Sequence, residues 1–163
     1  MHEVIISNTT PIFYLHRVGY LELLRKLYEE VIVPNAVIEE LEEGRKQGED
    51  VPEINNYQWI TVKKIQVPSR IKLIPDLGKG ESEVLALGLD EKQHLLIIDD
   101  KLAREIAKLQ NLKFTGTAGV LLKSKAKGYI TEIKPIIERL KEAGFYLRQE
   151  LFEYILAQAG ELK

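Results

Sequence analysis

The sequence has 163 residues, of which 45% are hydrophobic and 29% are charged, the balance of a globular protein with a sizeable core. Its net charge of -2 gives no general attraction for nucleic acid, so such a partner would need a local basic patch. The absence of cysteine excludes disulfides, thiolate metal sites and cysteine nucleophiles. No apolar run approaches the ~20 residues of a membrane-spanning helix, and the first residues lack the features of a signal peptide. We therefore expect a cytoplasmic protein that forms one domain over residues 1–163.

Short apolar runs alternate with helical segments along the chain. The predicted strands cover residues 3–7, 31–33, 59–67, 95–98 and 113–115. The predicted helices cover residues 9–16, 20–28, 34–44, 81–92, 102–109, 116–127, 133–143 and 149–159. Residues 44–52 and 68–80, which are rich in glycine, proline or polar residues, are predicted to be irregular. This order predicts a three-layer α/β fold: a central, mainly parallel sheet of four to five short strands, flanking helices and a helical C-terminal tail.

Residues 95–104 read Leu-Leu-Ile-Ile-Asp-Asp-Lys-Leu-Ala-Arg and place two adjacent carboxylates where a buried strand ends. In open α/β sheets, sites form in the crevice beyond the carboxyl ends of the strands. Like charges side by side need water, a cation or a basic partner to compensate them. A second interpretation is that one aspartate only caps the helix that begins near Lys101. Asp99, nearer the strand, is the better candidate ligand, and Asp100 is the better candidate cap.

Carboxylates on two predicted helices could face the same crevice. A rotation of ~100° per residue puts Glu40 at the margin of the buried stripe of its helix, although most residues in such positions are surface glutamates. The helix after Gly80 is apolar over most of its circumference, so Glu83 needs a partner or a metal. Glu81 has a simpler explanation, as a first-turn acid that interacts with the helix dipole.

The sequence therefore predicts a metal site at the edge of the sheet. The candidate ligands are oxygen donors that follow strands or lie on the connecting helices, at Asn8, Glu40, Glu83, Asp99 and Asp100. An acidic cluster favours Mg²⁺ or Mn²⁺, because the chain has no cysteine and its three histidines are scattered. Such an ion at a phosphodiester polarises the phosphoryl oxygens and generates hydroxide for in-line attack.

Five short motifs, in order, carry a resemblance to a known family over nearly the full length. They are Ile-Ser-Asn-Thr-Thr-Pro-Ile (6–12), Val-Pro-Asn-Ala-Val-Ile-Glu-Glu-Leu (33–41), Gly-Lys-Gly-Glu-Ser-Glu-Val-Leu-Ala-Leu (78–87), residues 95–104 with Gly-Thr-Ala-Gly-Val-Leu (116–121), and Ala-Gly-Phe-Tyr-Leu (143–147). The sequence resembles PIN-domain proteins, in a prokaryotic branch similar to VapC-type toxins. The resemblance implies a metal-dependent endoribonuclease, and its VapC-type branch suggests the toxin of a toxin–antitoxin pair, with an antitoxin protein as partner. It also implies that the hydroxyls of Thr9 and Thr117 assist the acids.

The sequence departs from the family pattern at Asn8, where the family's first acid would fall. An amide oxygen can coordinate a hard cation but brings no charge, so metal affinity should fall. The alternative function is therefore a catalytically impaired PIN fold that binds RNA or another protein. A phosphoacceptor receiver domain fits poorly, because its paired aspartates follow the first strand.

Two groups of basic residues could track an RNA backbone. They lie on neighbouring predicted helices, at Lys101, Arg104 and Lys108 and at Lys123, Lys125 and Lys127. A solvated face is the more common explanation of such a run. The apolar residues within 151–156 are predicted to close the core, with a homodimer contact as the alternative.

Overall fold

The computed structural model describes residues 3–162, and a five-stranded parallel sheet lies at its centre. The strands are β1 (Val4–Ser7), β2 (Val31–Pro34), β3 (Ile60–Lys63), β4 (His94–Ile97) and β5 (Phe114–Thr115). Their order across the sheet is β3-β2-β1-β4-β5, with every neighbouring pair parallel. The predicted α/β class and parallel sheet are confirmed.

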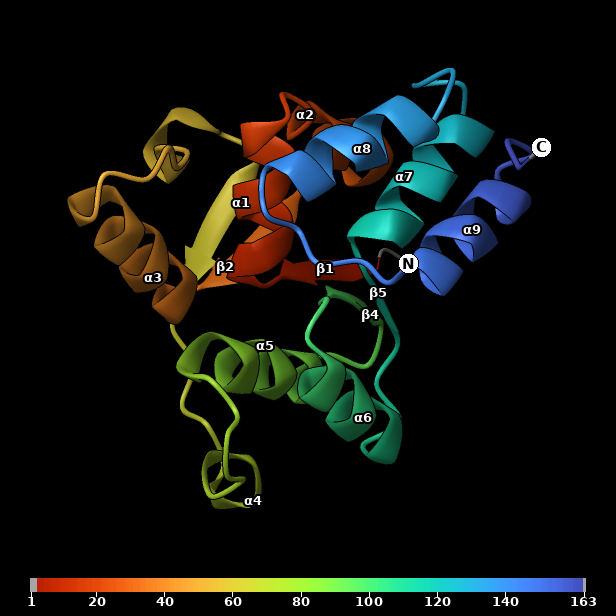
Figure 1. Ribbon diagram of the computed structural model, residues 1–163. Helices are drawn as coiled ribbons and strands as arrows, with labels where there is room; N and C mark the ends of the chain where they lie inside the picture. Colours follow the sequence, from red (N-terminus) through yellow and green to blue (C-terminus); the bar gives the residue numbers. More distant parts are fainter. Residues whose placement is uncertain (1–2, 163) are drawn as a thin grey trace.

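Helices cover both faces of the sheet, as Figure 1 shows. On one face lie α1 (Thr9–Arg17), α2 (Glu22–Tyr28), α7 (Thr117–Ala126), α8 (Lys134–Glu142) and α9 (Gln149–Gln158). On the other lie α4 (Ser69–Lys72), α5 (Lys79–Asp90) and α6 (Lys101–Leu109), while α3 (Asn35–Lys46) stands at one side of the sheet and contacts α1 and α5. A short 3-10 helix, η1 (Ile54–Asn56), precedes β3. No helix within residues 3–162 is both long and apolar enough to cross a membrane.

Alternation along the strands divides the core into two layers. In β1, Ile5 packs with the helices of the first face, and Ile6 packs with α5 and α6. In β4, Leu95 and Leu96 divide in the same way. The α5 helix is buried almost all round, as its composition predicts. Gly88 lets this helix approach β4, because a Cβ atom at position 88 would lie 3.0 Å from the Leu96 side chain.

Two predicted segment boundaries are wrong. The strand predicted over residues 59–67 ends at Lys63, because its only neighbour, β2, ends at the paired residue Pro34. The segment 68–80, predicted to be irregular, contains the one-turn helix α4 and the start of α5. The C-terminal apolar stretch closes the core through Phe152, Ile155 and Leu156, as predicted.

Candidate active site

The strand order reverses at β1, since β2 lies on one side of it and β4 on the other. A crevice opens at such a reversal, beyond the carboxyl ends of the strands. Ser7 pairs with Ile97, so the chain after β1 and the chain after β4 leave the sheet side by side. The Asn8 amide donates to the Ile97 carbonyl at 3.1 Å, which fixes Asn8 at this point.

Asn8 is buried, with 3% of its surface exposed. It occupies the N-cap position of α1, yet its side chain makes no capping hydrogen bond. Its Oδ1 atom is buried and has no hydrogen-bond partner within residues 3–162. Leaving a buried acceptor unsatisfied costs about 1–3 kcal/mol, so this oxygen is suited to a ligand.

Glu40, on α3, brings a carboxylate to the same place. The hydroxyl of Thr9 donates to Glu40 Oε1. A Cβ atom on Gly80 would lie 2.9 Å from Asn8 Oδ1 and closer still to Glu40 Oε1. Glycine at position 80 therefore lets these two oxygens pack close to the first turn of α5.

Glu81 contributes a further carboxylate from the first turn of α5. Partial burial raises the pKa of Glu81, and the negative charges of Glu40 and Asp100 raise it further. Hydrogen bonds from its own backbone amide and from Asn8 lower the pKa in part. From the sequence, Glu81 is expected only to interact with the helix dipole. The structure shows that it also lies near Asn8, Glu40 and Asp100.

Asp99 and Asp100 have different surroundings. Asp100 accepts from the Ala103 amide at 2.9 Å and caps α6, so the predicted cap is confirmed. Both oxygens of Asp99 accept from Thr117, from its amide at 2.9 Å and its hydroxyl at 2.6 Å. Burial raises the pKa of Asp99, while the Thr117 hydrogen bonds and the Arg104 charge act in the opposite direction.

Glu83 is buried and accepts from the Ala36 amide at 3.0 Å. Ala36 lies in the first turn of α3, whose N-cap residue Pro34 has no side-chain cap. Glu83 thus satisfies an otherwise orphan amide and places its charge at the positive end of that helix. The sequence predicts that buried Glu83 needs a partner or a metal. In the structure, its partner is the N-terminus of α3.

The chemistry of the donors fits a hard cation, although the acids are not grouped tightly. No three His, Asp or Glu side chains within residues 3–162 converge to hold a metal ion. The grouped oxygen donors are instead the orphan amide oxygen of Asn8 and the carboxylate of Glu40, with Glu81 near both. These are oxygen ligands, the type that Mg²⁺ and Mn²⁺ prefer. The assignment of the predicted residues to a metal stays a prediction.

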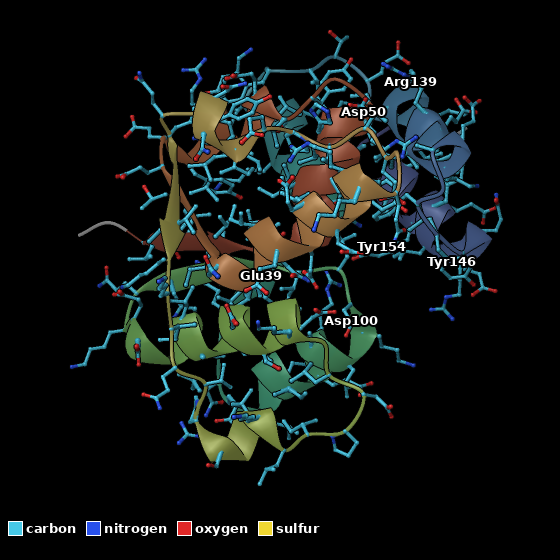
Figure 2. All side chains as sticks on the ribbon, turned by 90° about the vertical axis from the view of Figure 1, so that its left-hand side faces the viewer. Glu39, Asp50, Asp100, Arg139, Tyr146 and Tyr154 are labelled. Atoms are coloured by element: carbon cyan, nitrogen blue, oxygen red, sulfur yellow. The ribbon has the colours of Figure 1, made fainter. Side chains whose placement is uncertain are left out.

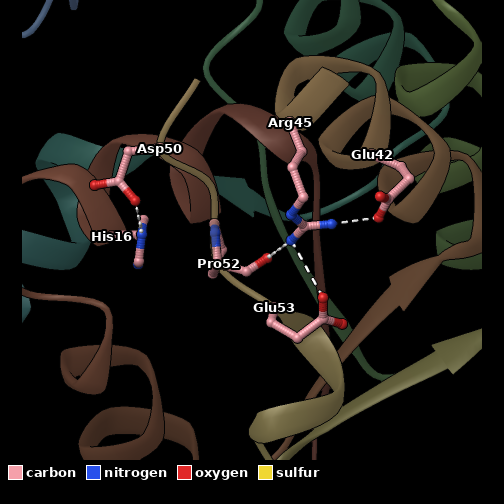
Figure 3. Close-up of polar contacts among 6 residues, drawn as sticks. All are labelled: His16, Glu42, Arg45, Asp50, Pro52 and Glu53. Atoms are coloured by element: carbon pink, nitrogen blue, oxygen red, sulfur yellow. Dashed lines mark hydrogen bonds and ion pairs between the residues drawn. The ribbon is translucent and has the colours of Figure 1, made fainter. Parts of the chain in front are cut away.

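A loop after α3 is held to α3 and α1 by polar contacts (Figure 3). Arg45 donates to the Pro52 carbonyl at 3.2 Å and pairs with Glu42, and His16 contacts Asp50 at 3.0 Å. A hollow of about 260 Å³ lies between this loop and α1, and is lined by Thr9 and Glu40 among others. Figure 2 shows Glu39 beside α5, where it pairs with Lys79, and Asp100 at the turn before α6.

Comparison with known proteins identifies the family. The model of the family DUF3368, described as a PIN domain, matches residues 4–161. Searches of curated proteins and of solved structures find no match. PIN domains are nuclease-type folds that generally use divalent metals and bind RNA. Since the match spans almost the entire chain, this protein belongs to the PIN-domain family.

Proposed function

We propose that the protein is a cytoplasmic, Mg²⁺- or Mn²⁺-dependent endoribonuclease, built as one PIN-like domain over its whole length. One observation carries the proposal: the buried, unpartnered Oδ1 of Asn8 lies beside the Glu40 carboxylate, where Gly80 lets both oxygens come close to α5. Among PIN-domain proteins, which are nuclease-type folds, grouped oxygen donors at the crevice of the sheet are suited to phosphodiester hydrolysis.

Three residues would hold the ion, namely Asn8, Glu40 and Glu81. When bound, the ion would polarise the phosphoryl group and lower the pKa of a bound water. Thr9 orients Glu40 through its hydrogen bond, and Thr117 holds Asp99 beside the crevice. Arg104 steadies this turn, since its Nε atom donates to the Ile98 carbonyl at 2.8 Å.

The test measures both Mn²⁺ binding by titration calorimetry and cleavage of a structured RNA. We expect Glu40→Gln and Glu81→Gln each to weaken Mn²⁺ binding and to lower cleavage at least ~100-fold, the scale of losing a charge-stabilising group. The matched control is Glu43→Gln, an exposed carboxylate on α3 that bonds only Gln47 among the described residues. Cleavage that survives both site substitutions belongs to a contaminant and overturns the proposal.

The pH dependence of binding provides a second readout. The pKa of Glu81 is raised, so part of this carboxyl remains protonated at a pH where an ordinary glutamate is ionised. Mn²⁺ affinity should therefore rise with pH above the usual glutamate range, with release of a proton on binding. Glu81→Gln should remove this dependence.

A second candidate function follows from the missing charge at Asn8: an impaired PIN fold that binds RNA or a protein. Asn8→Asp discriminates between the two. Wild-type protein that is inert, together with an Asn8→Asp variant that gains Mn²⁺ binding and cleavage, favours the impaired fold. A toxin role with an antitoxin partner, and a homodimer, are further proposals that co-purification and sedimentation can test.

A further inference from the structure

A groove of about 640 Å³ extends from the crevice along α6. It lies between α6 and the segment that leads into α9, and its lining includes Asp99, Lys101, Lys108, Phe114, Tyr146 and Arg148. We name it the α6 groove. Asp99 at one end connects it with the crevice, because Asp99 follows β4 and is held there by Thr117.

Three cations of the α6 groove have no ion-pair partner within residues 3–162: Lys101, Lys108 and Arg148. Lys101 and Lys108 are two turns apart on one face of α6, about 10 Å along the helix. All three side chains are exposed. The lining also holds the carboxylates of Asp99 and Glu105, but its basic side chains, with Arg104, outnumber them. In a protein of net charge -2, this local excess of positive charge favours a polyanion.

Three other basic residues on α6 and α7 are engaged internally. The Arg104 guanidinium lies over the Phe114 ring at 5.2 Å. On α7, Lys123 lies over the Tyr28 ring at 4.7 Å, and Lys125 pairs with Glu161 at 2.9 Å. The α6 group is therefore better suited to contact phosphates than the α7 group.

An aromatic ring completes the α6 groove. Tyr146 is 82% exposed, an unusual position for so large a side chain. Its neighbours Phe145 and Leu147 pack against the core, and Phe145 meets Tyr14 edge-on at 5.3 Å. The backbone of this segment is thus anchored while the Tyr146 side chain lines the groove; Figure 2 shows Tyr146 beside the α9 ribbon.

We propose that the α6 groove binds a single-stranded stretch of the RNA substrate, with one base stacked on Tyr146 and phosphates on Lys101, Lys108 and Arg148. This rests on the proposed function for the identity of the substrate as RNA. An exposed ring beside uncommitted cations is the combination that binds single strands, because each unstacked base offers a π-face and each phosphate a charge. A duplex hides its base faces and gains nothing from Tyr146.

The experiment measures binding without cleavage. Fluorescence anisotropy in excess EDTA compares a labelled 12-nucleotide single-stranded RNA with a blunt duplex of the same sequence. We expect tighter binding of the single strand and a ~10-fold or greater loss in Tyr146→Ala, the scale of one stacked base. Tyr146→Trp should bind as wild type, and so should Tyr154→Ala, which removes a 60% exposed tyrosine outside the groove.

Salt dependence tests the cations separately. For single strands, each phosphate contact contributes about -0.7 to the slope of log K against log salt. Lys101→Ala, Lys108→Ala and Arg148→Ala should each reduce the slope by about this amount. Lys92→Ala, an exposed lysine before β4 that lies outside the lining of the groove, should not. Equal slopes in all four variants would contradict the assignment of phosphates to the groove.

Three results would overturn the proposal. Tyr146→Ala could bind the single-stranded RNA with wild-type affinity, or the duplex could bind as tightly as the single strand. The third result is a protein dimer that the Tyr146→Ala substitution dissociates. The last would mean that a second copy occupies the groove. Failure of the proposed nuclease function would give a different result from failure of the groove. In that case the single-stranded RNA binds in EDTA, but adding Mn²⁺ yields no cleavage that depends on Glu81. Cleavage that depends on Glu81 while Tyr146→Ala leaves binding and KM unchanged rejects the groove alone.

Discussion

At the scale of single residues, the candidate site depends on the uncharged side chain of Asn8 and on the absence of a side chain at Gly80. Asn8 supplies a neutral oxygen, and the missing side chain of Gly80 lets that oxygen and Glu40 lie close to α5. A neutral side chain adds no repulsion to the neighbouring carboxylates, where burial, and then the charges of Glu40 and Asp100, already raise the pKa of Glu81. It also lowers the attraction for a cation, so nearby Glu40 and Glu81 become more important.

Gly80→Ala tests this arrangement. The added methyl group would clash with Asn8 Oδ1 and Glu40 Oε1 and displace them, so the Mn²⁺-induced rise in Tm should disappear and cleavage should fall at least ~10-fold, the scale of losing a ligand or a group that positions it. The clash opposes the preference of helices for alanine over glycine, about 1 kcal/mol, so the Tm without Mn²⁺ should change little. Differential scanning fluorimetry with and without Mn²⁺ measures both effects. An undiminished metal response in Gly80→Ala would rule out these two oxygens as the site.

Residue-level prediction from sequence was strongest where charge follows a strand. The position of Asp99 and Asp100 beyond β4, and of Asn8 beyond β1, follows from the buried strands that precede them. For Glu81 the sequence indicates only the helix dipole, whereas the structure places it near Asn8 and Glu40. A helical wheel gives the direction of a side chain but not the neighbouring element that it meets. The apolar circumference of α5 correctly required a partner for Glu83, but only the placement of α3 determines that this partner is the Ala36 amide.

At the scale of elements, α3 and α5 are joined by that one buried hydrogen bond. The first turn of α3 has no side-chain cap of its own, and α5 supplies the carboxylate instead. Since α3 carries Glu40, the contact also fixes the position of a candidate metal ligand. A substitution of Glu83 should therefore lower the stability of the fold and also weaken metal binding.

Glu83→Ala should lower the free energy of unfolding by about 1–3 kcal/mol, the cost of an unsatisfied buried amide. Glu83→Gln retains an acceptor oxygen and should cost less. Urea unfolding measures both, with Glu138→Ala, an exposed carboxylate on α8, as the control. Wild-type stability in Glu83→Ala would show that the α3 terminus does not need this carboxylate.

At the scale of the whole molecule, the C-terminal end is tied to two helices by Glu161. Its carboxylate accepts from the Ile133 amide at 2.7 Å and the Lys134 amide at 2.9 Å, and pairs with Lys125. Burial alone would raise the pKa of Glu161, but these hydrogen bonds and the Lys125 charge lower it overall. The charged form of Glu161 therefore stabilises the fold.

The sign of the pH effect follows from this lowered pKa. A carboxyl whose folded pKa lies below its unfolded value contributes stability that is complete above about pH 4.5 and is lost as pH falls through the folded value. Glu161→Gln should be less stable than wild type at pH 7, and the difference should shrink as the pH is lowered from 5 to 3. Urea midpoints at several pH values measure this. A difference that stays constant with pH would contradict the role of the charge.

The order of the strands has a consequence for synthesis of the chain. β1 is made first, yet its partner β4 lies about ninety residues later, with Ser7 opposite Ile97. The crevice needs Asn8 from the beginning of the chain and Asp100 and Thr117 from much further along. A nascent chain on the ribosome therefore lacks the candidate site until α6 and the start of α7 have emerged. Any RNA-cleaving activity stays latent through most of translation, close to the very RNAs it could damage.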